Sequence, residues 1–148
     1  MKYYKGKYKP KNLKKYEGDF SNITYRSHWE RQAFKWCDDN KDIIGWSSES
    51  VIVPYRCKTD GKMHRYFVDL FIRMKDGSCY LIEIKPKKQT VPPKERSRKT
   101  KKYLNEVMTY AKNLSKWEAA QAFAHKRGMK FQVWHEETLR SLGIKLLT

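Results

Sequence analysis

Apolar side chains recur at helical spacing in the first third of the chain, directly after a polar stretch. Ala33 and Cys37 lie four residues apart, and Ser27 with Glu30 three residues later matches the capping box that opens a helix. This pattern predicts a first helix from about Ser27 to Asp39.

The middle of the chain is rich in β-branched and aromatic residues, which favour strands. Residues 51–55 predict one strand and residues 66–74 a second one. Residues 75–78 are typical of a turn, so residues 79–85 should return as the hairpin partner of the second strand.

The last third of the chain alternates between helical and strand patterns. A helical stripe covers residues 104–114, and a second capping box, Ser115 with Glu118, predicts another helix that ends at Gly128. A strand over residues 130–134 and a short helix over residues 136–142 should follow. Without an internal repeat, this order predicts a mixed α/β domain.

The charge of the chain indicates the kind of partner. Its 148 residues fit one domain, and 33 Lys+Arg against 16 Asp+Glu give a formal net charge of +17, which predicts a polyanionic partner. Residues 1–20 interleave lysines with tyrosines and lack an apolar period, so we expect a flexible basic arm before a domain over residues 21–148.

Several classes of protein are not expected from the sequence. We find no apolar leader, lipidation signal or broad apolar helix face, so neither secretion nor membrane binding is expected. The three cysteines, Cys37, Cys57 and Cys79, contain no C-x-x-C pair, which indicates reduced thiols in packing or surface positions.

The predicted hairpin carries an unusual set of charged residues. Glu83 and Lys85 share one face of their strand, and the turn after Met74 can bring Asp69 beside Glu83. Two neighbouring carboxylates repel each other, and a divalent cation resolves the conflict. Mg²⁺ suits Asp69, Glu83 and a main-chain carbonyl near Ile84. Lys85 could then orient water or stabilise charge during phosphodiester hydrolysis.

Each of these residues also has an ordinary structural interpretation. Asp69, Glu83 and Lys85 could form the solvent face of a surface hairpin. Glu30 could be a further metal ligand or an orienting carboxylate, but it is equally natural as the acid of the capping box.

Asp69, followed fourteen residues later by Glu83-Ile84-Lys85 and preceded by a helix with Glu30, resembles the PD-(D/E)XK nuclease superfamily. A wider set of segments resembles the head completion nucleases of T4-like tailed phages: Tyr25-Arg26-Ser27-x-Trp29-Glu30, Pro54-Tyr55, His64-Arg65-Tyr66-Phe67-x-Asp69 and Leu81-Ile82-Glu83-Ile84-Lys85-Pro86. The segment Asn113-x-x-Lys116-Trp117-x-Ala119-Ala120, with Gly128 and Phe131, is also similar to the N-terminal domain of TnsA-type transposon endonucleases.

The resemblance implies a restriction-endonuclease-like core, in which helices flank a small mixed β-sheet. It implies Glu30 as the helix-borne acid, Asp69 and Glu83 as metal-binding acids and Lys85 as the catalytic lysine. Val68 stands where the superfamily has a proline before the aspartate, but that proline provides no ligand.

The activity that the resemblance implies is Mg²⁺-dependent DNA cleavage, with Mn²⁺ as a substitute. The enzyme would act in finishing filled phage heads before tail attachment, with head, portal or neck proteins as partners. Its place would be the cytoplasm of the infected host and the virion. Two alternatives stay open: a non-enzymatic DNA-binding head or neck protein, and a transposase-associated or repair endonuclease.

Basic residues around the proposed site are candidates for binding DNA. Arg26, His64 and Arg65 could bind phosphate, although ordinary surface salt bridges are an alternative for all three. Lys116 could close over the site, or it could be a solvated neighbour of a core tryptophan. A cationic, proline-containing loop should border the substrate and contributes Lys87, Lys88 and Arg96.

Overall fold

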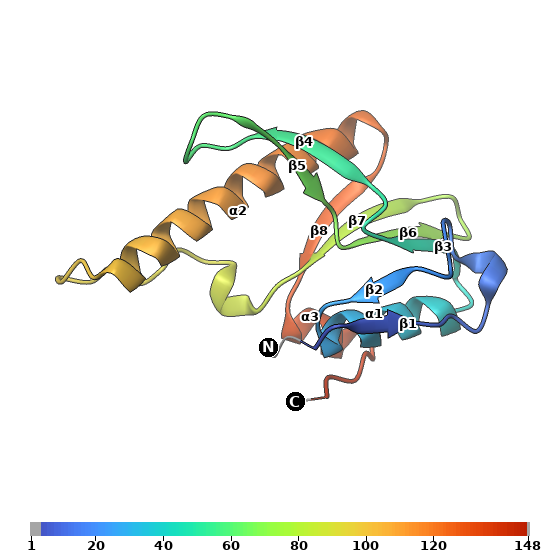
Figure 1. Cartoon of the computed structure of the whole chain (residues 1–148). Coiled ribbons are helices and arrows are strands. Elements are labelled where there is room, and N and C mark those ends of the chain that lie inside the picture. Colours follow the sequence, from blue (N-terminus) through green and yellow to red (C-terminus); the bar gives the residue numbers. More distant parts are fainter. Residues whose placement is uncertain (1–3, 148) are drawn as a thin grey trace.

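The computed structural model of the protein describes residues 4–147, so residues 1–3 of the expected arm lie outside the described part (Figure 1). The core is a four-stranded sheet in the order β3-β6-β7-β8, formed by Ile43–Ser48, Leu70–Met74, Cys79–Ile84 and Lys130–Trp134. The first three strands are antiparallel, whereas β8 runs parallel to β7. This sheet confirms the expected mixed α/β, restriction-endonuclease-like fold.

The two faces of the sheet are covered by different elements (Figure 1). Helix α1 (His28–Asp39) and the short helix α3 (Glu136–Ser141) pack on one face, in a core that includes Ile82 and Ile84. Helix α2 (Lys101–Lys126) and a hairpin of β4 (Ile52–Arg56) and β5 (Met63–Phe67) cover the other face. Leu81 belongs to that second core, because successive residues of β7 point to opposite faces.

Helix α1 begins as the capping box predicts. Ser27 is its N-cap, and the Ser27 hydroxyl accepts a hydrogen bond from the Glu30 amide at 3.2 Å. The Glu30 carboxylate accepts the amide of Arg26 at 3.2 Å, one residue before the position that the motif anticipates.

Residues 4–20 pack against the domain, whereas the sequence led us to expect an arm without regular packing. Strand β1 (Gly6–Tyr8) pairs with β2 (Ile23–Tyr25), and Tyr16 is buried with its ring 4.7 Å from that of Trp46. Tyr8 and Tyr16 pack against the core, whereas Lys9, Lys11 and Lys14 between them are exposed, so a search for one continuous apolar run does not reveal this packing.

Two further segments differ from the prediction. Residues 66–74 form two strands, because the chain leaves the β4–β5 hairpin at Phe67 and enters the central sheet at Leu70. The two helices predicted before and after Ser115 form one continuous helix, α2. The Ser115 hydroxyl donates to the Ala111 carbonyl and accepts the Lys58 amide, both at 3.1 Å, so it ties α2 to a neighbouring loop and caps nothing.

Strand β3, at the edge of the four-stranded sheet, was not predicted at all. Its residues include Gly45 and two serines, which lower its β-propensity, but Ile43 and Trp46 are buried in the core.

None of the helices in the described part of the chain combines the length and the apolar character that crossing a membrane requires.

Candidate active site

Asp69 and Glu83 lie opposite each other at the same end of neighbouring strands. Leu70 pairs with Ile82, so the antiparallel register places the preceding Asp69 across from the following Glu83. The Asp69 Oδ2 accepts the amide of Ile84 at 2.8 Å, which fixes the aspartate against β7. The hairpin therefore gathers the two carboxyl groups that the sequence predicted would meet.

The electrostatics of Asp69 reflect this crowding. Burial raises the pKa of Asp69 well above its usual range, and the charge of Glu83, a hydrogen bond shared with that carboxyl and the charge of Glu30 raise it further. The Ile84 amide acts in the opposite direction, but it does not compensate for the other effects. The pair consequently holds a proton more tightly than isolated carboxyl groups do.

Glu83 lies next to two aromatic residues, Trp117 and Tyr66, and the sequence did not predict that Tyr66 is its neighbour. Only 4% of Glu83 is exposed, and its Oε2 accepts the indole N–H of Trp117 at 3.0 Å. The Tyr66 hydroxyl is buried and has no hydrogen-bond partner of normal geometry in the described chain. Burial raises the pKa of Tyr66, and the neighbouring charges of Glu83 and Asp69 raise it further.

Two lysines accompany the carboxyl groups. Lys85 follows Glu83 on the same face of the chain, and its amide donates to the Trp134 carbonyl at 3.0 Å. No acid of the described residues forms an ion pair with the Lys85 ammonium. The Lys116 ammonium lies 5.5 Å from the centre of the Tyr66 ring.

The environment of Lys116 combines opposing effects. Burial lowers the pKa of Lys116, and the charge of Lys85 lowers it further, whereas Glu83 and Asp69 raise it. The Lys116 ammonium is thus within electrostatic range of Glu83, Asp69 and Lys85. Lys116, one of the predicted DNA-binding residues, therefore lies beside the acids.

Glu30 lies at the edge of the site. Burial raises the pKa of Glu30, and its charge in turn raises the pKa of Asp69. The ligand oxygens of Glu30, Asp69 and Glu83 do not come together within 4.8 Å in the described structure. Glu30 is thus a flanking acid next to a closer pair.

Glu49 is a member of this acidic group that the sequence did not reveal. It directly follows β3, where its amide donates to the Asp69 carbonyl at 3.3 Å, and its φ of 53° is unusual for a residue other than glycine. Its carboxylate pairs with Arg26 at 2.8 Å. The local sequence of serines around Glu49 resembles a loop, so only the strand register could have identified it.

The other predicted DNA-binding residues lie in different places. His64 pairs with Asp60 at 2.7 Å, and the Arg65 guanidinium lies 5.5 Å from the Phe67 ring, both on the β4–β5 hairpin. Lys87 pairs with Glu137 at 3.1 Å, and Lys88 and Arg96 are exposed in the segment between β7 and α2. The structure therefore groups Arg26 and Lys116 with the acids, whereas the remaining five lie on the β4–β5 hairpin and in the segment after β7.

The site fits a divalent metal ion. Asp69 and Glu83 offer oxygen ligands, which Mg²⁺ prefers, and a cation would relieve the repulsion that raises the pKa of Asp69. The unpartnered Tyr66 hydroxyl could hydrogen-bond to a water in the same space. Asp69 and Glu83 are the residues that would hold the ion directly.

Comparison with known proteins agrees with this picture. Residues 40–136 match the family model "TnsA-like endonuclease N terminal", a range that contains Asp69, Glu83 and Lys85. The chain is also 47% identical over 146 residues to the head completion nuclease of Enterobacteria phage T4, covering 96% of this chain and 97% of that protein. No solved structure gives a significant match. The chain therefore belongs to the TnsA-like endonuclease family.

Proposed function

We propose that the protein is a Mg²⁺-dependent DNA endonuclease, in which Mn²⁺ can substitute for Mg²⁺. The observation that carries the proposal is the pairing of the partly buried Asp69 with the buried Glu83, followed on the same strand face by Lys85, whose ammonium has no ion-pair partner among the described residues. A purely structural hairpin gains nothing from two carboxyl groups that repel each other in a buried place.

Each residue has a definite part in the proposed reaction. A bound Mg²⁺ supplies Lewis acidity and a more acidic water for hydrolysis of a phosphodiester. Asp69 and Glu83 would hold the ion, and the Trp117 indole N–H fixes one oxygen of the Glu83 carboxylate by a hydrogen bond. Lys85 stabilises the negative charge that develops on the phosphate. Glu30, as a flanking acid, orients water next to the pair.

The charge of the chain supports DNA as the substrate. A net charge of +17 favours binding to phosphates, and Arg26, Lys116, Lys88 and Arg96 lie around the acids or in the segment after β7. Helix α1 and the C-terminal half of α2 pack on the central sheet. We infer cleavage with little sequence preference, since contacts to phosphates carry no sequence information.

The setting that we propose is the completion of phage heads after DNA packaging and before tail attachment. The name of the T4 relative supports it, and the two proteins match over nearly their whole lengths. Head, portal or neck proteins would then be partners. The enzyme would act in the cytoplasm of the infected cell and could remain in the virion.

The proposal is tested by plasmid nicking with and without Mg²⁺. Asp69→Asn and Lys85→Met should each lower the nicking rate by at least about 100-fold, as expected for groups that act on the transition state. Asp76→Asn and Lys75→Met are matched controls at the turn end of the same hairpin, and both should cut at the wild-type rate.

DNA binding in metal-free buffer separates catalysis from a purely structural role. The two site variants should bind a duplex as tightly as the wild type does. Tight binding by wild-type protein that never nicks with Mg²⁺ or Mn²⁺ would support the non-enzymatic alternative and overturn the proposal.

A further inference from the structure

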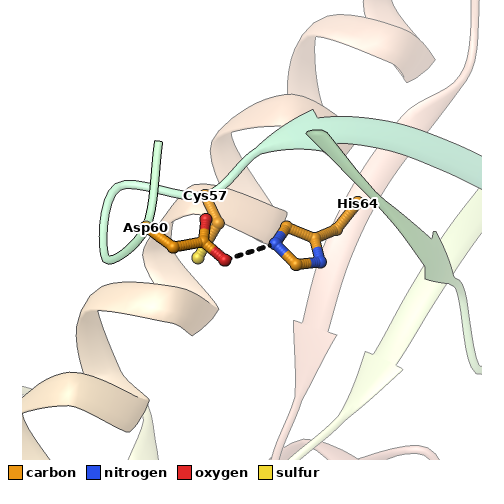
Figure 2. A group of neighbouring side chains, drawn as sticks. All are labelled: Cys57, Asp60 and His64. Carbon is orange, nitrogen blue, oxygen red and sulfur yellow. Dashed lines mark hydrogen bonds and ion pairs between the residues drawn. The ribbon is translucent and has the colours of Figure 1, made fainter. Parts of the chain in front are cut away.

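The turn of the β4–β5 hairpin gathers a thiol, a carboxylate and an imidazole (Figure 2). The Cys57 Sγ, an Asp60 oxygen and a His64 ring nitrogen all lie within 4.8 Å of one another. Among the described residues, no other set of three such ligands comes this close. None of the three takes part in the carboxyl pair of Asp69 and Glu83.

We propose that Cys57, Asp60 and His64 form a binding site for a transition-metal ion, with Zn²⁺ as the natural occupant. Zn²⁺ accepts sulfur, nitrogen and oxygen ligands together, whereas Mg²⁺ prefers oxygen alone. A thiolate and a carboxylate would balance the two positive charges of the ion. Water would complete the tetrahedral coordination.

The spacing of the ligand atoms suits such an ion. With metal bonds of the usual length, the nitrogen and oxygen ligands of a tetrahedral Zn²⁺ site are about 3.3 Å apart, and a sulfur ligand lies slightly farther away. The His64 Nε2 and the Asp60 Oδ2 are 2.7 Å apart. Small side-chain rotations that move these two atoms apart by less than about one ångström would make room for the ion.

The turn holds each ligand in place. The Asp60 Oδ1 accepts the Lys62 amide at 2.9 Å, which leaves its other oxygen directed at His64. The His64 ring stacks on Tyr55 with 5.6 Å between ring centres. Gly61, at a φ of 69°, donates to the Cys57 carbonyl at 2.7 Å and closes the turn. Such hydrogen bonds behind the ligands are typical of metal sites.

The thiol and its access also fit. The Thr59 hydroxyl lies 3.0 Å from the Cys57 sulfur. Asp60 and His64 are exposed, so an ion can reach these two ligands from solvent, and the buried Cys57 sulfur lies behind them. The spacing Cys57-x2-Asp60-x3-His64 escapes a search for paired cysteines, because one ligand is a carboxylate.

The test is a titration of the reduced, full-length protein with Co²⁺, which replaces Zn²⁺ and gives a visible signature. One equivalent should produce intense tetrahedral d–d bands and a thiolate-to-cobalt charge-transfer band, and Zn²⁺ should displace it. Cys57→Ser should abolish the charge-transfer band. Cys79→Ser, which alters a partly exposed cysteine elsewhere, and Asp69→Asn, which alters the carboxyl pair, should both retain it.

Two more variants test the remaining ligands. Asp60→Asn and His64→Gln should each weaken Zn²⁺ binding by at least about 100-fold, because even partners behind a ligand change affinity by 10- to 100-fold. Zn²⁺ should raise the Tm of the wild type and leave that of these variants unchanged. A wild type without the thiolate band, or a band that persists in Cys57→Ser, would overturn the proposal and leave Asp60 and His64 as a plain surface ion pair.

Discussion

Asp69 carries an electrostatic cost in the place where we propose that a metal ion binds. Its carboxyl group faces Glu83 and receives only one backbone amide, that of Ile84. The sequence located this residue correctly, because an acid within an apolar strand pattern is conspicuous. The strand pairing with Glu83 was also predictable from the turn at residues 75–78. Glu49 was not, because its position depends on the register of β3, which the sequence pattern did not reveal.

Replacing Asp69 by Asn should stabilise the metal-free protein at neutral pH. The pKa of Asp69 is raised in the folded state, so folding binds a proton, and stability falls as pH rises above the unfolded-state pKa near 3.8. The wild type should therefore be less stable at pH 7 than at pH 5. Asp69→Asn should remove this loss and raise the free energy of unfolding at pH 7 by about 1–2 kcal/mol.

Urea unfolding at several pH values, with EDTA present, measures this effect. Asp76→Asn is the control, because hydrogen bonds from Ser78 lower the pKa of the exposed Asp76 and its loss should not stabilise the protein. An Asp69→Asn variant with the same pH slope as the wild type would contradict the prediction.

At the scale of elements, the sequence predicted those elements that have a strong local motif. It did not predict the features that depend on tertiary contacts. The capping box at Ser27 located α1, and the turn at residues 75–78 located the β6–β7 hairpin. Ser115 also matched a capping box, but it lies inside α2, because its hydroxyl bonds to the Ala111 carbonyl of the preceding turn. A motif of four residues cannot distinguish a helix start from a helix interior when both neighbouring segments favour a helix.

The N-cap of α1 offers an element-scale prediction. Ser27→Ala removes the acceptor for the Glu30 amide and should lower the free energy of unfolding by about 1 kcal/mol. Because the same turn carries Glu30, nicking should also slow. Thr100→Ala removes the equivalent cap of α2, where the Thr100 hydroxyl accepts the Tyr103 amide at 3.1 Å.

Thr100→Ala is thus a matched control, with a similar loss of stability but no change at Glu30. Urea unfolding and nicking rates of the two variants, compared at the same temperature, give the result. Equal nicking rates in both variants would show that the N-cap of α1 does not affect the function of the acidic residues.

At the scale of the whole molecule, charge is the dominant property. The net charge of +17 is spread over the surface, and only part of it is paired in the six salt bridges of the described structure. The net charge follows from composition alone, whereas only the fold shows which basic residues lie near the acids.

We predict a steep salt dependence of DNA binding in metal-free buffer. If about six phosphates are neutralised, affinity should fall by about 1000-fold between 50 and 200 mM salt. Lys88→Gln and Arg96→Gln should each reduce the slope of log affinity against log salt by about one. Lys75→Gln, which affects a lysine paired with Asp42, should leave the slope unchanged, and fluorescence anisotropy measures all three.

The short connection between β5 and β6 affects how the protein tolerates mutations in its two cores. Val68 is anchored in the core under α2, and Leu70, two positions later, is anchored in the core under α1. The neighbours of Asp69 on both sides are therefore buried, each in a different hydrophobic core. A repacking mutation in either core, however remote, would therefore be transmitted to the Asp69 carboxyl.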